Sequence, residues 1–290
     1  MDAAKAIALL AKNTGKIWEY VYKGPGQKYK KFNKALPLIM VPTLAATGSE
    51  LNSGAVISNP ETREKTVLFG ADLYPKITII DPGLTKSVPY TSTVDGAVDI
   101  IVHVLEMYLS TKDVDYLQDQ LALALTKTVK KNLDILKVDL ANSAARAEIF
   151  WAAALALSGI VNKGRSGEFP MHDIEHVLSG FCDNLAHGRG LAKIFLEMLN
   201  YEQKEIPGKI INLSKNVFEQ QINNATEAIK KWQEWFAFHE TGDSLKEYIG
   251  DIPVEKIADK ILQFSGTPDF LPNVRIFEKS ELINFIQALI

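Results

Sequence analysis

The sequence predicts a small α/β segment followed by a larger all-helical region. Up to about residue 80, the apolar residues come in short runs bounded by turn residues, which is typical of β-strands. Beyond about residue 85 they recur at three- and four-residue intervals, which is typical of helices, and no convincing strand follows. We therefore divide the chain into residues 1–84 and 85–290.

Turn and capping signals give the individual elements. A helix is expected over residues 2–12, with Asp2 as its N-cap and Gly15 as its stop signal. Strands are expected over residues 36–41, 55–58, 65–69 and 76–80. Further helices are expected over residues 93–109, 114–136, 144–161, 217–238 and 254–264.

The composition excludes several classes of protein. The chain has 290 residues, 47 % of them hydrophobic, and its 32 basic and 35 acidic residues give a formal net charge of −3. This balance argues against a disordered chain and against a protein that binds polyanions through its global charge. The sequence has no signal-peptide pattern and no apolar run of the ~18 residues that a membrane span needs. Because no such run is present, we expect no membrane partner. Cys182 is the only cysteine, so no intrachain disulfide is possible and we expect a cytoplasmic protein.

Four of the five histidines lie between residues 103 and 187. Asp99 and His103 are four residues apart, which places a carboxylate and an imidazole on one face of a helix. His172 and His176 repeat this spacing, and His187 follows. One carboxylate with two or three imidazoles suits a divalent ion such as iron(II) or zinc. A solvated helix face or a capped core histidine is the alternative interpretation. The apolar neighbours of Asp99 and His103 argue against it, because they indicate a buried helix. Burying a carboxylate or an imidazole without a partner costs several kcal/mol.

The turn at residues 42–50 follows the first predicted strand and is rich in small and hydroxyl residues. Backbone N–H groups at such a turn, next to a predicted helix start, can bind a pyrophosphate. A turn without a ligand is the alternative interpretation, because most Gly, Ser and Thr turns bind nothing.

A basic segment at residues 16–34 interleaves six lysines with aromatic residues, a combination that can bind single-stranded nucleic acid. We prefer a surface loop that packs its aromatic side chains inward, and we expect no nucleic-acid partner. The aromatic residues around Trp232 have helical spacing and are expected in the core. We expect His239 to be a surface or packing histidine, and Cys182 to lie in a loop or the core.

Three motifs, read in order, resemble those of the iron-containing (group III, metal-dependent) alcohol dehydrogenases, in the branch of butanol and aldehyde-reducing dehydrogenases. They are Thr43-Leu-Ala-Ala-Thr-Gly-Ser-Glu-Leu-Asn52, Asp99-x3-His103-Val-Leu-Glu106-x-Tyr108, and His172-Asp-Ile-Glu-His176 followed by Ala186-His187-Gly188-x-Gly190. The resemblance covers essentially the whole chain. It implies the dehydroquinate synthase-like fold of this family, in which an α/β dinucleotide-binding domain precedes an all-α domain and a divalent metal lies in the cleft between them.

The resemblance also implies roles for individual residues. By motif, the four metal ligands are Asp99, His103, His172 and His187, with Fe²⁺ as the expected ion and Zn²⁺ as the alternative. His176 corresponds to a histidine near the substrate that relays a proton. The residues implied to contact NAD or NADP are Asp2, Thr43, Thr47, Ser49, Asn52 and Lys65.

The implied reaction is hydride transfer between the nicotinamide and a short-chain alcohol or aldehyde such as butanol, and a homodimer is a further expectation. The sequence departs from the family in two ways. One extra residue separates His172 from His187, and we place it in a loop at residues 181–185. Asp2 aligns just after the family's glycine-rich phosphate loop, so we expect that loop and the strands before it to be missing. A truncated metal-binding remnant with weak or no dehydrogenase activity is therefore the alternative function.

Overall fold

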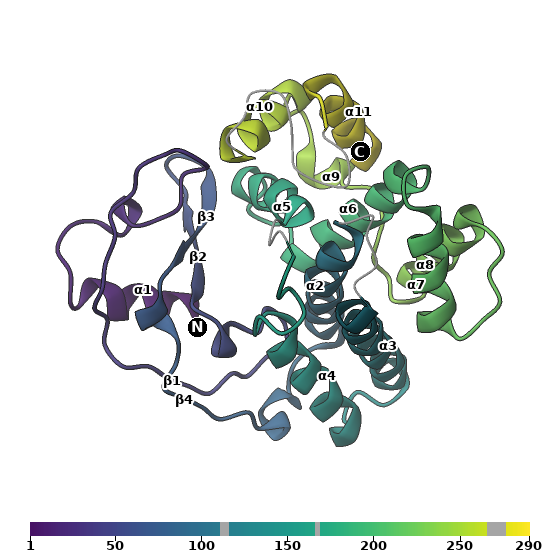
Figure 1. Ribbon diagram of the computed structural model, residues 1–290, viewed down its shortest axis with the longest axis horizontal. Coiled ribbons are helices and arrows are strands. Elements are labelled where there is room, and N and C mark those ends of the chain that lie inside the picture. Colours follow the sequence, from purple (N-terminus) through teal and green to yellow (C-terminus); the bar gives the residue numbers. More distant parts are fainter. Residues whose placement is uncertain (111–115, 166–168, 266–276) are drawn as a thin grey trace.

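The computed structural model describes residues 1–110, 116–165, 169–265 and 277–290. The strands of these residues lie in the N-terminal part, and every helix beyond residue 89 belongs to a helical part beside it (Figure 1). This arrangement confirms the predicted α/β part followed by a helical part. The predicted start of a helix at residues 114–115 lies outside the described residues.

The N-terminal part contains one α-helix, α1 (Asp2–Leu10), several short 3₁₀ helices and two small sheets. Strands β1 (Ile39–Met40) and β4 (Ile77–Thr78) pair in parallel. Strands β2 (Gly54–Asn59) and β3 (Glu64–Phe69) form an antiparallel hairpin, in which Gly54 lies opposite Phe69. All four predicted strands are therefore present, although β1 and β4 are shorter than expected.

Asp2 does not cap α1, as the sequence had suggested. The helix begins at Asp2 itself, Met1 is the N-cap residue, and the helix ends at Leu10, well before Gly15. The carboxylate of Asp2 instead accepts hydrogen bonds from the Ser49 hydroxyl (2.6 Å) and the backbone N–H of Val56 (2.9 Å). These long-range partners draw the side chain toward β2 and away from its own helix terminus.

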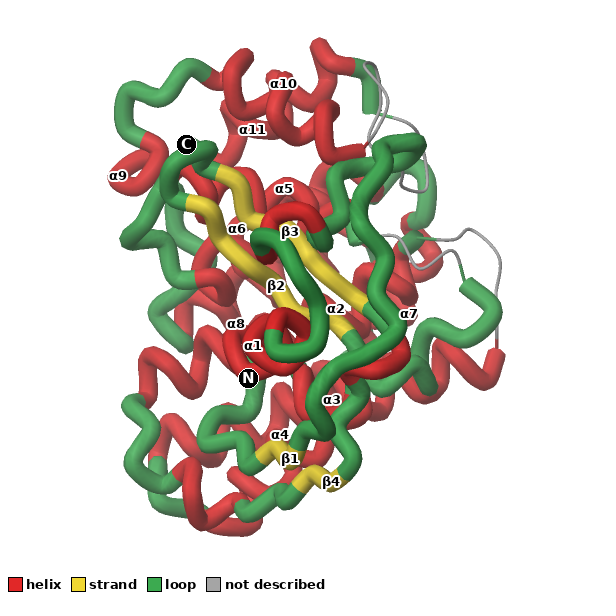
Figure 2. The backbone as a smooth tube through the Cα atoms, turned by 90° about the vertical axis from the view of Figure 1, so that its left-hand side faces the viewer, coloured by secondary structure: helices red, strands yellow, loops and turns green. Residues whose placement is uncertain are grey.

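The helical part is built around a long central helix. Its elements are α2 (Tyr90–Leu109), α3 (Tyr116–Val138), α4 (Ser143–Ala156), α5 (Pro170–Phe181), α6 (His187–Glu202), α7 (Pro207–Phe218), α8 (Ala225–Phe238), α9 (Lys246–Ile249), α10 (Val254–Ser265) and α11 (Lys279–Leu289). Helix α2 packs against α3, α4, α5 and α6, and its residues from Gly96 to Leu109 are all buried. Figure 2 shows the β2–β3 hairpin in front of α5, which β3 contacts.

Two predicted helices differ from the structure by more than a few residues. The stretch over residues 217–238 is divided, because Glu219 adopts a left-handed conformation (φ 55°) and ends α7. Helix α8 starts only after Asn224, whose side chain accepts a hydrogen bond from the backbone N–H of Glu227. Helix α4 ends at Ala156 rather than near residue 161, and Gly159 follows with a φ of 91° that continues no helix.

His239 is a buried packing histidine rather than a surface residue. Its Nε2 lies 3.0 Å from an oxygen of Asp134 on α3, and the same oxygen accepts a hydrogen bond from the indole N–H of Trp235 (2.8 Å). Lys130 pairs with the other oxygen at 2.8 Å. Burial raises the pKa of Asp134, but His239 and Lys130 outweigh it, so this pKa lies below its ordinary value.

We expect Asp134→Asn to lower the free energy of unfolding by about 1–2 kcal/mol at pH 7, because charged hydrogen bonds are lost. The folded-state pKa of Asp134 is lowered, so its contribution is present above the unfolded pKa of about 3.9 and disappears as the pH falls through the folded pKa. Urea unfolding at several pH values should therefore show that the free energies of unfolding of wild type and variant converge as the pH falls below about 4.

The matched control is Glu234→Gln, which alters an exposed carboxylate on α8 and should change the stability by less than about 0.5 kcal/mol. A stability difference that stays constant down to pH 2 would contradict the assigned pairing of Asp134.

No described helix has the length and apolar character that a membrane crossing requires.

Candidate metal centre and active site

A cavity of about 400 Å³ lies between the N-terminal and helical parts. One wall comes from the loop before β2 and from the hairpin, and includes Thr47 and Lys65. The opposite wall contains the clustered histidines. The predicted site residues that line the cavity are Asp2, Thr47, Ser49, Asn52, Lys65, His103, His172, His176 and His187. Thr43 is exposed and is not among the residues that line it.

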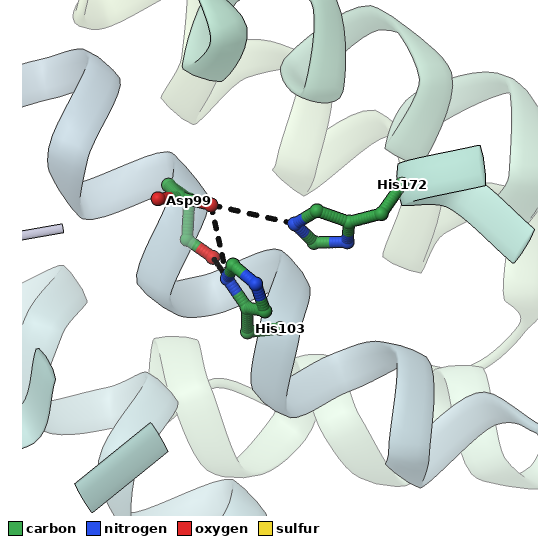
Figure 3. Close-up of side chains that lie close together, drawn as sticks. All are labelled: Asp99, His103 and His172. Carbon is green, nitrogen blue, oxygen red and sulfur yellow. Dashed lines mark hydrogen bonds and ion pairs between the residues drawn. The ribbon is translucent and has the colours of Figure 1, made fainter. Parts of the chain in front are cut away.

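Asp99 and His103 occupy one face of α2, as their spacing predicts. The imidazole N–H at Nδ1 of His103 donates to the backbone carbonyl of Asp99 (2.8 Å), and Oδ1 of Asp99 lies 2.9 Å from the same nitrogen. Both side chains are almost completely buried, because α2 is covered by its neighbouring helices. Figure 3 shows that the carboxylate of Asp99 also faces the imidazole of His172, which lies on α5.

His172 is held at both ends of its ring. Its Nδ1–H donates to the carboxylate of Glu106, and its Nε2 lies 3.4 Å from Oδ1 of Asp99. Glu106 also accepts hydrogen bonds from the backbone N–H groups of Met171 and His172, which are free because they lie in the first turn of α5. Glu106 thus fixes both the start of the helix and the orientation of its imidazole.

His187 repeats this arrangement from another helix. It is the first residue of α6, its Nδ1–H donates to the buried carboxylate of Glu175, and its Nε2 lies 3.6 Å from Oδ1 of Asp99. The next residue, Gly188, allows α6 to lie this close to α2, since a Cβ there would be 2.0 Å from the carbonyl oxygen of Asp95. The stretch of residues 181–185, in which the sequence places the extra residue, comprises the end of α5 and most of the loop before α6.

The donor set fits a divalent cation. Two histidines direct Nε2 toward one carboxylate oxygen while a glutamate holds each Nδ1, which is the usual support of metal-binding histidines. Candidate donor atoms of Asp99, His103 and His172 lie within 4.8 Å of one another. A buried set of one carboxylate and several imidazoles suits both iron(II) and zinc.

The electrostatics of the site agree with this fit. Burial lowers the pKa of His172, but Glu106 and Asp99 outweigh it and raise the pKa to about 10. Burial raises the pKa of Asp99, but His103 and His172 hold it well below its ordinary value. Asp99 is therefore ionised at neutral pH and His172 carries a proton beside it. A divalent cation would replace that proton, because a ligating imidazole must be neutral.

His176 lies one turn after His172 and lines the same cavity. Burial, and then repulsion by the Lys65 ammonium, hold its pKa well below the ordinary value, so the ring is neutral at pH 7. Its ring stacks on His187 with centroids 5.5 Å apart. Glu175, His176 and His187 form a second group of candidate metal donors, but Lys65 Nζ lies 3.1 Å from Glu175 and already supplies a positive charge there.

Lys5 organises the loop before β2, which forms part of one wall of the cavity. Its ammonium group is fully buried and donates to the backbone carbonyls of Ser49 (2.6 Å), Asn52 (2.8 Å) and Gly54 (2.7 Å). The side-chain oxygens of Ser49 and Asn52 are also within hydrogen-bonding distance. Because Asp2 accepts from the Ser49 hydroxyl, both charged residues of α1 fix the shape of this loop.

Sequence reasoning missed the roles of Lys5, Glu106 and Glu175. A signal was present for Glu106, which is three residues after His103 and seven after Asp99, so that all three share one helix face. Glu175 is likewise three residues after His172, but no local pattern connects it with His187. Lys5 lies one turn after Asp2, and its partners are 44 to 49 residues away.

Comparison with known proteins finds relatives along most of the chain. Residues 1–82 match the model of the iron-containing alcohol dehydrogenases, and residues 93–289 match that of the C-terminal region of the Fe-containing alcohol dehydrogenase family. NADH-dependent butanol dehydrogenase B of Clostridium acetobutylicum is 34 % identical over 242 residues, which cover 81 % of this chain and 60 % of that protein. The probable NADH-dependent butanol dehydrogenase 1 of Bacillus subtilis is 35 % identical over 99 % of this chain and 74 % of its own length.

Among solved structures, NADH-dependent butanol dehydrogenase A from Thermotoga maritima superposes with a TM-score of 0.89 at 31 % identity, covering 99 % of this chain and 73 % of that one. The chain thus spans roughly 60 to 74 % of the length of these relatives. The family matches together cover most of the chain and confirm the predicted fold and the NAD(P)-linked, metal-dependent oxidoreductase class of its family. The chain belongs to the iron-containing alcohol dehydrogenase family.

Proposed function

We propose that this chain is a metal-dependent, NAD(P)H-linked aldehyde reductase and alcohol dehydrogenase for short-chain substrates such as butyraldehyde and butanol. One observation carries the proposal. His172 and His187 both direct Nε2 toward one oxygen of Asp99, at 3.4 and 3.6 Å, in the wall of a cavity of about 400 Å³. The same cavity has a polar loop on its other side, so one space can hold a cation, a cofactor and a small substrate.

In this proposal the cation is Fe²⁺, with Zn²⁺ as the alternative, and its ligands are Asp99, His103, His172 and His187. The ionised state of Asp99 and the depressed pKa of His103, caused by burial and then by repulsion from His172, favour ligation, because metal ligands must be deprotonated. Glu106 and Glu175 would orient two of the imidazoles.

The dinucleotide would lie along the loop before β2 and the hairpin. The hydroxyls of Thr47 and Ser49, the amide of Asn52 and the ammonium of Lys65 line the cavity there and can bind polar groups of the cofactor. Asp2 would act through Ser49, since both of its oxygens already accept hydrogen bonds within the protein. A contact with Thr43 is also proposed, from the motif that the chain shares with its family.

When bound, the metal would polarise the carbonyl group of the aldehyde and the nicotinamide would supply the hydride. Reduction also consumes one proton, which ends on the alcohol oxygen. His176 is neutral and lines the cavity, so it can take up a proton at one ring nitrogen and release one from the other. It would therefore relay a proton between solvent and the substrate oxygen.

The family division supports a proposal for the domains as well. We propose a nucleotide-binding part at residues 1–84 and a metal-binding part at residues 85–290, a boundary that lies between the two family matches. A homodimer, a cytoplasmic location and the absence of a nucleic-acid partner stay predictions. Light scattering after gel filtration tests the first, and salt-dependent retention of an oligonucleotide would contradict the last.

The test is an anaerobic assay of metal-loaded protein with butyraldehyde and either NADH or NADPH. We expect the absorbance of the reduced cofactor to fall only when aldehyde is present. A chelator should abolish this activity, and restoring Fe²⁺ or Zn²⁺ should recover it. Protein that binds a metal ion but reduces no aldehyde with either cofactor would contradict the proposal. That result would support the alternative of a metal-binding remnant without dehydrogenase activity.

A further inference from the structure

Glu175 connects the two walls of the cavity. It lies on α5 and is fully buried, and one of its oxygens accepts a hydrogen bond from the Ser179 hydroxyl. Its other oxygen accepts from Nδ1–H of His187 and from Nζ of Lys65, the latter at 3.1 Å. A single carboxylate oxygen therefore holds one residue proposed to bind the metal and one proposed to bind the cofactor.

The pair of Glu175 and Lys65 is a buried contact between α5 and the hairpin. Lys65 lies on β3 and keeps part of its side chain in the cavity, whereas the nearby pair of Arg63 and Asp183 is solvent-exposed. Gly180 lets α5 lie against β3 at this point, since a Cβ there would be 2.6 Å from the carbonyl oxygen of Arg63. The close packing leaves Glu175 little freedom to move away from either partner.

We propose that Glu175 is a positioning residue that couples binding of the divalent cation to binding of the dinucleotide; the inference rests on the proposed function. A cation at Nε2 of His187 withdraws electron density from the ring and makes its Nδ1–H a stronger donor to Glu175. Glu175 then satisfies less of the charge of Lys65, and that ammonium is more available to the cofactor in the cavity. The coupling is positive and, by linkage, reciprocal.

The test compares NADH dissociation constants measured by fluorescence titration with and without saturating zinc. In wild type we expect zinc to tighten NADH binding about tenfold, within the usual range for coupled sites. In Glu175→Gln and in Lys65→Met we expect the ratio of the NADH dissociation constants without and with zinc to fall to about threefold. This remaining factor would come from the direct attraction between a cation and an anionic cofactor.

Two variants are controls. Asp183→Asn makes the same carboxylate-to-amide change at the exposed pair and should keep the tenfold factor. Glu106→Gln should weaken zinc binding about 10- to 100-fold, yet keep the factor at saturating zinc, because Glu106 holds His172 and does not contact Lys65. Circular dichroism melts establish that each variant is folded, and Lys65→Met carries the test if Glu175→Gln fails to fold.

The outcomes separate the two proposals. A tenfold factor that survives in folded Glu175→Gln or Lys65→Met would overturn the role of Glu175. Zinc and NADH that bind wild type independently would also overturn it, while leaving the proposed function intact. Wild type that binds neither zinc nor NADH would overturn the proposed function itself.

Discussion

Replacing His103 with alanine is expected to lower the bound iron or zinc from about one ion per chain to less than about one tenth. The imidazole of His103 lies against that of His172, with ring centroids 3.9 Å apart, and both face the carboxylate of Asp99. Loss of one of the few donors in a buried site leaves too few protein ligands to retain the ion. The measurement is metal analysis of protein that has been loaded and then passed through a gel-filtration column.

The control for this experiment is His239→Ala, which removes another buried histidine that does not line the cavity. This variant should lose stability but retain the metal, because its partners are Asp134 and Tyr90. If folded His103→Ala protein still holds one ion per chain, the ligand assignment is wrong.

Replacing Lys5 with methionine is expected to lower the free energy of unfolding of the metal-free chain by about 2–4 kcal/mol. Methionine fills a similar volume but leaves the carbonyls of Ser49, Asn52 and Gly54 without their donor, and Asp2 without a nearby positive charge. Burial lowers the pKa of Lys5 to about 8, so the ammonium is still mostly charged at pH 7. Urea unfolding measures the loss of stability.

The same variant distinguishes the proposed cofactor-binding role of the loop before β2 from the proposed metal-binding role of the histidines. We expect NADH binding to weaken about tenfold because the loop is no longer fixed, while zinc binding stays within about twofold of wild type. The matched control is Lys12→Met, which changes an exposed lysine just after α1 and should alter neither quantity. A loss of stability below about 1 kcal/mol in Lys5→Met would contradict this role.

Local patterns predict the four strands and several helical stretches, whereas α5, α6, α9 and α11 lie outside those predicted ranges. The four strands and the central helix α2 follow from such patterns, because the runs of buried residues are continuous in the sequence. The break between α7 and α8 does not show in the sequence pattern, because the apolar residues around it keep a helical period although Glu219 adopts a left-handed conformation and ends α7. The sequence predicts Asp2 as a cap because no local pattern reveals its actual partners, which lie 47 and 54 residues away.

The candidate site divides in the same way. The spacing of Asp99 and His103 predicts that they share a helix face, and the structure has them in contact. The approach of His172 and His187 to Asp99 depends on how α5 and α6 pack against α2, which no local spacing reports. Glu175 shows the limit most clearly, since its role depends on Lys65, which is 110 residues away and on the other wall of the cavity.

The most direct test of the central claim is anomalous diffraction at the zinc absorption edge from crystals of the zinc-loaded protein. We predict a single strong peak about 2.0–2.2 Å from a carboxylate oxygen of Asp99 and from ring nitrogens of His103, His172 and His187. A peak bonded to Glu175 and His176 instead, or the absence of any peak beside Asp99, would contradict the account.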